Sequence, residues 1–303
     1  MAQLKKTDTQ LLEIAYYEHG APDGWPVVLT HGFPYDAHAY DAVVPLLVRR
    51  GARVIVPYLR GFGETRFLFA ITMRTGQQAA LAADIISLLD ALDIPQAVLA
   101  GFDWGGLASC AAAALWPERV AGLVSYAGYD IADIAAQQRE PAPPGLECVM
   151  WYQHLFQSER GRACLARDRR ALCRLLWTQW SPTWRFAEAD FERAAAAFEN
   201  PDFVDVVVHA YRFVHGKEAG DPALDGLEAR LAARPRIAVP CVTLDGAQDP
   251  LKPGGSAGHA EMFVGRHERR VFDVGHAFPV EAPGAFAQAV IDVHDWSVAT
   301  TVV

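Results

Sequence analysis

The chain has 303 residues, of which 51% are hydrophobic and 21% charged, a composition typical of a folded globular protein. Its formal net charge of -9 argues against nucleic acid or an anionic membrane as a partner. The five cysteines are scattered and form no C-x-x-C pair, so they indicate neither a disulfide framework nor a metal site. The first residues contain no long apolar run, so we expect no signal peptide, no membrane span and a cytoplasmic location.

The first half of the chain alternates segments typical of strands and helices. Strands are predicted at residues 11–18, 26–30, 52–57, 96–100 and 120–126, and helices at 40–50 and 77–92. Further strands are predicted at 237–244 and 270–274, followed by a closing helix at 283–296. Short apolar strands that alternate with helices predict an α/β fold with a mostly parallel, doubly wound sheet.

A helical segment interrupts this alternation. Residues 141–145, PAPPG, form a stiff linker, and the residues from 146 to about 220 favour helix without a clear strand. We therefore predict a core domain made of residues 1–140 and 236–303, with an inserted all-helical cap at residues 141–235. The cap is expected over the carboxyl edge of the sheet, where sheets of this kind bind ligands.

The sequence GFDWGG at residues 101–106 follows a predicted strand and precedes an Ala-rich helix. Its G-x-D-x-G pattern has the form of the G-x-S-x-G nucleophile elbow, with Asp103 in place of the serine. The alternative is an aspartate that caps the following helix. A carboxylate on this turn can attack an alkyl carbon without first losing a proton, which gives an alkyl–enzyme ester.

Three further loops complete a candidate site. Asp249 lies in the loop after strand 237–244, and His276 lies in the loop after strand 270–274. Nucleophile, acid and histidine follow in the chain order of α/β-hydrolases, although an aspartate before a proline is also common in turns. The loop HGFP at residues 31–34 is expected to offer the backbone N–H of Phe33, together with that of Trp104, as an oxyanion hole.

Over nearly its whole length the chain resembles the epoxide hydrolases of the α/β-hydrolase fold, in the branch with an aspartate nucleophile. The resemblance rests on HGFP at 31–34, RGFGET at 60–65, GFDWGG at 101–106, DGAQDP at 245–250 and GHAFP at 275–279. It implies Asp103 as nucleophile and the pair Asp249–His276 as acid and base. Asp130, which follows the predicted strand at 120–126, is the alternative acid, because some relatives place the acid after that strand.

The resemblance also implies two cap tyrosines that donate hydrogen bonds to the epoxide oxygen. Among the nine tyrosines, Tyr152 and Tyr211 alone fall within the predicted cap. A tyrosine hydroxyl, with a reference pKa of about 10, stays protonated at neutral pH and can assist a leaving alkoxide. A leaving halide needs no such proton. For either residue alone, an aromatic side chain in the core of the cap is a fair alternative.

The predicted reaction converts an epoxide to a vicinal diol through an ester on Asp103, which water activated by His276 and Asp249 then hydrolyses. The alternatives are a haloalkane dehalogenase, which shares the aspartate–tryptophan elbow, and a non-catalytic ligand-binding protein on the same fold. Dehalogenases of that kind usually carry an asparagine where this chain has Phe33. The predicted substrate pocket also includes Pro34, Trp151, Phe156 and His209. No cofactor and no metal are expected, the partners are the epoxide and water, and a homodimer is compatible with the sequence.

Overall fold

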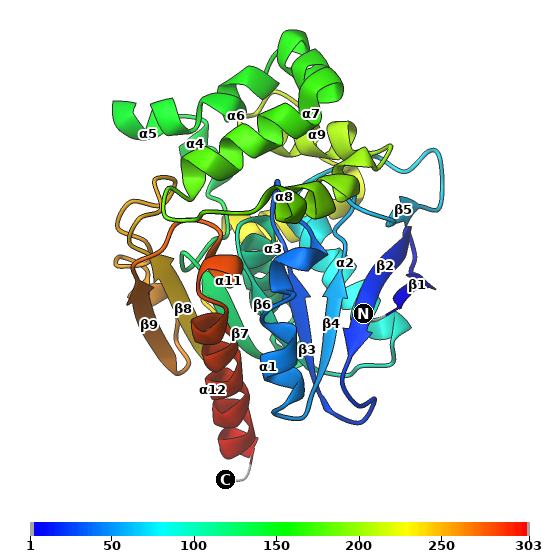
Figure 1. Cartoon of the computed structure of the whole chain (residues 1–303), viewed down its shortest axis with the longest axis vertical. Coiled ribbons are helices and arrows are strands. Elements are labelled where there is room, and N and C mark those ends of the chain that lie inside the picture. Colours follow the sequence, from blue (N-terminus) through cyan, green and yellow to red (C-terminus); the bar gives the residue numbers. More distant parts are fainter. Residues whose placement is uncertain (1–2, 302–303) are drawn as a thin grey trace.

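The computed structural model describes residues 3–301, and a nine-stranded sheet runs through its centre (Figure 1). The strands are β1 (Leu4–Asp8), β2 (Leu12–His19), β3 (Trp25–Thr30), β4 (Ala52–Pro57), β5 (Arg66–Phe67), β6 (Ala97–Gly101), β7 (Val120–Tyr126), β8 (Cys241–Gly246) and β9 (His267–Phe272). They lie in the order β1-β2-β4-β3-β6-β7-β8-β9, with β5 paired to β2. The run from β4 to β9 across the sheet is parallel, whereas β1, β2 and β5 pair antiparallel. The predicted fold class is therefore confirmed.

Helices cover both faces of the sheet and one of its ends (Figure 1). The helices are α1 (Val44–Val48), α2 (Gln78–Ala91), α3 (Trp104–Leu115), α4 (Ile134–Gln137), α5 (Pro144–Val149), α6 (Trp151–Phe156), α7 (Glu159–Trp180), α8 (Glu188–Ala195), α9 (Phe203–Val214), α10 (Asp225–Ala232), α11 (Phe278–Glu281) and α12 (Pro283–Thr301). Short 3₁₀ turns lie at Ala37–Tyr40, Pro117–Arg119, Ala196–Glu199, Pro222–Leu224 and Ala260–Met262. α2 and α3 pack together on one face and α1 and α12 on the other, so β6 and its neighbours are buried on both sides.

A layer made of α5 to α9 lies over the carboxyl edge of the sheet (Figure 1). Two hydrogen bonds join α7 to loops of that edge: Trp177 Nε1 donates to the Pro34 carbonyl at 2.7 Å, and the His276 amide donates to the Trp180 carbonyl at 3.0 Å. Because these loops follow β3 and β9, one helix of the layer contacts both sides of the candidate site.

The division into a core and a cap at residues 140/141 and 235/236 stays a prediction, but α10 differs from its expected place. It falls inside the predicted cap segment, yet it packs against α2 and α3. Glu228 on α10 accepts a hydrogen bond from the Ala79 amide at the start of α2, and Arg230 donates to the Leu115 carbonyl at the end of α3. Free backbone groups at helix ends need such partners, so α10 is fixed to the helices of the sheet.

The strands β1 and β5 were not predicted from the sequence. β1 has the polar sequence LKKTD and pairs only with β2, at the edge of the sheet. An edge strand that faces water lacks the apolar alternation by which buried strands are recognised. The helix predicted at 40–50 is also shorter than expected: it consists of the 3₁₀ turn Ala37–Tyr40 followed by α1.

Candidate active site

Asp103 lies at the sharp turn between β6 and α3. Its backbone has φ 53° and ψ -127°, a region that residues other than glycine rarely adopt. Close packing surrounds the turn, because a Cβ on Gly105 would lie 1.9 Å from the Thr30 carbonyl oxygen and one on Gly101 would lie 2.3 Å from Gly105. The Asp103 side chain makes no capping hydrogen bond to α3. The helix-cap alternative is therefore wrong, and the turn holds the carboxylate away from the helix.

The loop after β3 reaches the same carboxylate. The Phe33 amide donates a hydrogen bond to Asp103 Oδ1 at 2.8 Å. Gly32 makes this approach possible, since a Cβ at that position would come within 2.3 Å of the Asp103 side chain. β3 and β6 are neighbours at the point where the strand order reverses, so their following loops meet at one place. Within residues 3–301, Phe33 supplies the one backbone amide that donates to this carboxylate; the part expected of Trp104 stays a prediction.

His276 lies between two carboxylates. Its Nδ1 is 2.8 Å from Asp249 Oδ2, and its Nε2 is 3.3 Å from Asp103 Oδ2. The side chain of His276 is 1% exposed and that of Asp249 is fully buried. Asp130 has a different partner, because its Oδ1 accepts a hydrogen bond from Lys252 Nζ at 2.5 Å. Of the two acids left open by the sequence, the geometry therefore joins Asp249 to His276.

The charges in this row shift the pKa of His276 and that of Asp249. Burial alone would lower the pKa of His276, but the charge of Asp249 and the hydrogen bonds to both aspartates raise it to about 10. Burial would likewise raise the pKa of Asp249, but the positive charge of His276 and hydrogen bonds from His276, Leu251 and Tyr126 hold it below its usual value. At neutral pH these shifts favour an imidazolium at His276 paired with the carboxylate of Asp249.

Tyr152 on α6 and Tyr211 on α9 lie together above this row. Their rings are perpendicular, with centroids 5.3 Å apart. The ring of Tyr211 lies 5.7 Å from that of Phe33, whose amide donates to Asp103, and 5.8 Å from that of Trp104, the residue after Asp103. Burial, and then the negative charge of Asp103, raise the pKa of Tyr152; burial also raises that of Tyr211. Both hydroxyls therefore stay protonated at neutral pH.

A glutamine orients one of these hydroxyls. Gln153 Nε2 donates to the Tyr152 hydroxyl oxygen at 3.1 Å, and His215 Nε2 lies 3.1 Å from Gln153 Oε1. A hydroxyl that accepts from an amide keeps its own proton for another acceptor. The neighbouring Gln157 donates to the Tyr211 carbonyl at 3.1 Å, so α6 is tied to α9 close to both tyrosines.

The predicted pocket residues separate into two groups. Phe156 is fully buried and its ring lies 5.6 Å from that of Tyr211, and Pro34 accepts a hydrogen bond from Trp177 beside the site. Trp151 is different: its indole N–H donates to Gln179 on α7 in an exposed position, although its ring touches Tyr152. Trp151 thus ties two cap helices together.

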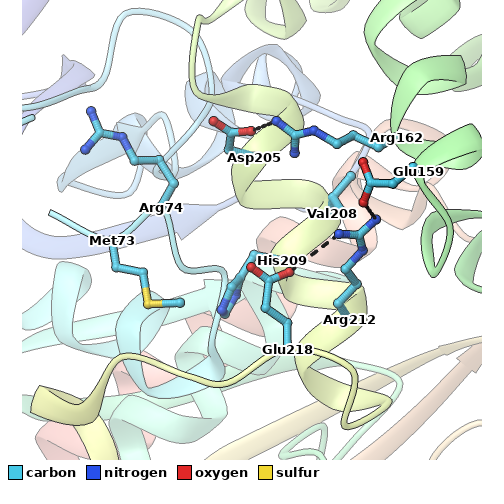
Figure 2. Close-up of a pocket in the computed structure, with 9 residues that line it drawn as sticks. All are labelled: Met73, Arg74, Glu159, Arg162, Asp205, Val208, His209, Arg212 and Glu218. Carbon is cyan, nitrogen blue, oxygen red and sulfur yellow. Dashed lines mark hydrogen bonds and ion pairs between the residues drawn. The ribbon is translucent and has the colours of Figure 1, made fainter. Parts of the chain in front are cut away.

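The contacts of His209 are with two loops, and its expected part in the substrate pocket stays a prediction. His209 Nδ1 accepts from the Gly76 amide at 3.1 Å, and its Nε2 lies 3.0 Å from the Ala219 carbonyl oxygen. His209 lines a pocket of about 270 Å³ whose walls include Arg74, Arg162 and Arg212. Figure 2 shows these side chains. Both ring nitrogens are engaged with backbone, so His209 fastens two loops to α9.

Two residues that contact the site were not among the predicted site residues: Tyr126, which sequence reasoning missed, and Trp180, which it considered only as a cap aromatic. Tyr126, the last residue of β7, donates from its hydroxyl to Asp249 Oδ2 at 2.8 Å and is 3.0 Å from the Gly275 carbonyl oxygen. Trp180, at the end of α7, is fully buried with its ring 5.0 Å from Tyr152 and 5.3 Å from His276. No motif marks either residue; the position of Tyr126 at the carboxyl end of a central strand was the available signal.

Residues 3–301 contain no group of three or more histidine, cysteine, aspartate or glutamate side chains placed to hold a metal ion. In the same range, no helix is both long and apolar enough to cross a membrane.

The chain belongs to the α/β hydrolase fold family, whose model matches residues 26–283. A solved structure from Klebsiella pneumoniae, provisionally named an epoxide hydrolase, is 44% identical and superposes with a TM-score of 0.95 over 97% of both chains. A Pseudomonas aeruginosa structure given the same provisional name is 20% identical with a TM-score of 0.80 over 98% of this chain and 97% of that one, which shows the fold alone.

The relatives similar to this chain include proteins with different activities. Epoxide hydrolase A of Mycobacterium tuberculosis is 31% identical over 137 residues, which are 45% of this chain and 40% of that protein. A haloalkane dehalogenase of Mycolicibacterium paratuberculosis is 26% identical over 86% of this chain and 78% of its own length. The chain thus spans about two fifths of the first of these relatives and most of the second.

Proposed function

We propose that this α/β hydrolase is an epoxide hydrolase that forms a covalent ester on Asp103. The observation that carries the proposal is the pairing of Tyr152 and Tyr211, two buried and protonated hydroxyls above a carboxylate that has His276 beside it. A carboxylate and a histidine alone would serve several leaving groups. Two phenolic donors suit a leaving group that needs a proton or a strong hydrogen bond, as an alkoxide does.

In the first step, Asp103 attacks a ring carbon of the epoxide. Oδ1 accepts the shorter hydrogen bond, from the Phe33 amide at 2.8 Å, whereas Oδ2 makes the longer 3.3 Å contact with His276 Nε2, so we assign Oδ2 as the oxygen that forms the new bond to carbon. The carbon–oxygen bond of the ring breaks in line with the attack, and the ring oxygen takes its proton from Tyr152 or Tyr211. The orientation that Gln153 imposes on Tyr152 leaves the hydroxyl proton available for this transfer. General acids in such positions contribute about 10²- to 10⁴-fold.

In the second step, water attacks the carbonyl carbon of the ester. Alkylation has by then removed the negative charge of Asp103, one of the groups that raise the pKa of His276. His276 therefore becomes easier to deprotonate when the ester forms. Its proton returns to the tyrosinate left by the first step, and the neutral imidazole then takes a proton from water. Oδ1 carries the developing oxyanion, which the Phe33 N–H stabilises. When the ester bond to the diol oxygen breaks, His276 gives that proton to the diol oxygen and the diol leaves. The carboxylic acid formed on Asp103 then passes its proton to His276, which restores the starting state.

A haloalkane dehalogenase is the second candidate, favoured by the 26% identical relative that aligns over most of the chain. It would use the same aspartate and histidine. The pair of buried tyrosines distinguishes the two reactions, because a halide leaves without a proton. The cytoplasmic location and the homodimer remain predictions.

The experiment that tests the proposal combines a trapped intermediate with a substrate panel. The variant His276→Gln should still form the ester but fail to hydrolyse it, so intact-protein mass should rise by the mass of the added epoxide. A panel of terminal and aryl epoxides and alkyl bromides should give diols from the wild type without bromide release. Bromide release with no diol from any epoxide would assign the site to dehalogenation, and no adduct with either class would leave a binding protein.

A further inference from the structure

Tyr126 connects three parts of the site. It is the last residue of β7 and is 1% exposed. Its hydroxyl lies 2.8 Å from Asp249 Oδ2 and 3.0 Å from the carbonyl oxygen of Gly275, the residue before His276. Its ring also meets the imidazole edge-on, with centroids 5.6 Å apart and an interplanar angle of 84°. One side chain thus touches the acid, the backbone of the histidine loop and the histidine ring.

The Asp249 carboxylate has a defined set of donors. Oδ1 accepts from the Leu251 amide at 2.8 Å, and Oδ2 accepts from both His276 Nδ1 and the Tyr126 hydroxyl. The Leu251 bond is local to the loop after β8 and fixes the carboxylate to its own backbone. The Tyr126 bond comes from a different strand, so it sets the direction of Oδ2 relative to the histidine loop.

The histidine loop, residues 275–277, is held by contacts that include the hydrogen bond from the His276 amide to the Trp180 carbonyl. Gly275 has little space, because a Cβ there would lie 2.6 Å from the Ser181 Cα. The Gly275 amide donates to Glu281, and the Ala277 amide donates to Ser181 Oγ at 2.9 Å. These contacts hold the loop from the cap side and from α11. From β7, the Tyr126 hydroxyl contacts both the Gly275 carbonyl oxygen and Asp249 Oδ2, so one hydroxyl group touches the loop and the acid.

We propose that Tyr126 is a positioning residue that keeps His276 aimed at the ester carbonyl in the second half of the reaction. This inference rests on the proposed ester mechanism. Tyr126 touches neither Asp103 nor the cap tyrosines in the described hydrogen bonds and ring contacts, so it acts through Asp249 and Gly275. Ester formation needs the carboxylate of Asp103 and a proton donor, whereas ester hydrolysis needs an aligned base. The two steps should therefore respond differently to its loss.

The test measures both steps in the variant Tyr126→Phe. Phenylalanine keeps the ring and removes only the hydroxyl, so the fold should persist. In single-turnover experiments with an accepted epoxide, ester formation should stay within about twofold of the wild type. Ester hydrolysis should slow by about 10- to 100-fold, the loss expected when a hydrogen bond to a charged group is removed. The ester should consequently accumulate during steady-state turnover and be visible as a mass adduct.

Tyr129→Phe is the matched control. Tyr129 is also buried, and its hydroxyl donates to the Pro235 carbonyl at 2.9 Å, away from the triad. Both variants should lose a similar amount of thermal stability, and only Tyr126→Phe should accumulate ester. Equal slowing of both steps, or unchanged hydrolysis in a folded Tyr126→Phe protein, would overturn the positioning role. Failure of the ester mechanism itself would look different, because the wild type and His276→Gln would then form no adduct.

Discussion

The floor of the site and its cap are built in different ways. The floor consists of Asp103, Asp249 and His276, which come from loops at the carboxyl ends of β6, β8 and β9, and hydrogen bonds connect them in one row. The cap contributes Tyr152 and Tyr211 from two helices, held mainly by aromatic packing. In the proposed mechanism, the floor supplies a nucleophile and a base that suit many substrates, and the cap helices supply the proton donors that select the leaving group.

The largest effect is expected from a change to Asp249, the acid of the floor. Asp249→Asn removes the charge that orients and stabilises the His276 imidazolium, so turnover should fall by about 10⁴-fold. The turnover of Asp130→Asn should fall far less, because Asp130 pairs with Lys252. Steady-state rates of the two variants provide the measurement. A larger loss in Asp130→Asn would transfer the acid role to that residue.

The second test removes the hydroxyl groups of the two cap tyrosines. Either Tyr152→Phe or Tyr211→Phe should slow ring opening partially, and the double variant should lose about 10²- to 10⁴-fold because no acid remains for the alkoxide. Non-additive losses are expected from groups that act together. Ester formation in a single turnover is the quantity to measure, with a melting curve as the check on folding. A folded double variant that opens epoxides at the wild-type rate would make the tyrosines mere packing residues.

The third test concerns the pH dependence of stability that follows from the raised pKa of His276. His276 has a pKa of about 10 in the folded protein, above its reference value of about 6.5. A group with a raised pKa contributes stability that is fully present below the unfolded value and is lost as the pH rises through the folded value. The wild type should therefore lose stability relative to His276→Gln between about pH 6.5 and pH 10. Denaturant unfolding at several pH values measures this, and parallel curves for the two proteins would refute it.

The fourth and smallest effect concerns the orientation of a cap hydroxyl. Gln153→Leu removes the amide that donates to Tyr152 and should slow ring opening by about 3- to 10-fold, the cost of one neutral hydrogen bond. In a Tyr152→Phe background the same change should have no further effect. Gln179→Leu, which loses a hydrogen bond to Trp151 on the outside of the cap, is the control. Equal slowing in both backgrounds would mean that Gln153 acts on the cap as a whole.

The sequence predicted the floor better than the cap, for a geometric reason. Loops after parallel strands meet at one edge of a sheet, so chain order alone brings Asp103, Asp249 and His276 together. It left the choice between Asp249 and Asp130 open, because both follow central strands. The structure distinguishes the two aspartates by their contacts: Asp249 contacts His276, and Asp130 contacts Lys252.

Side chains on cap helices are harder to assign from sequence. Successive residues of a helix are about 100° apart, so His209 and Tyr211 project about 200° apart on α9. The ring of Tyr211 contacts that of Tyr152, whereas His209 contacts the loops at Gly76 and Ala219. Neighbouring positions in the sequence of this helix therefore make different contacts.

The most direct test of the central claim is the fate of isotopic oxygen in one turnover. Excess unlabelled enzyme should be mixed with an accepted epoxide in ¹⁸O-labelled water, and both the diol and the peptide that contains Asp103 analysed by mass. Attack by Asp103, followed by hydrolysis at the ester carbonyl, predicts label in the Asp103 carboxylate and an unlabelled diol. Label in the diol with an unlabelled Asp103 would show that water attacks the epoxide directly and would contradict the ester mechanism.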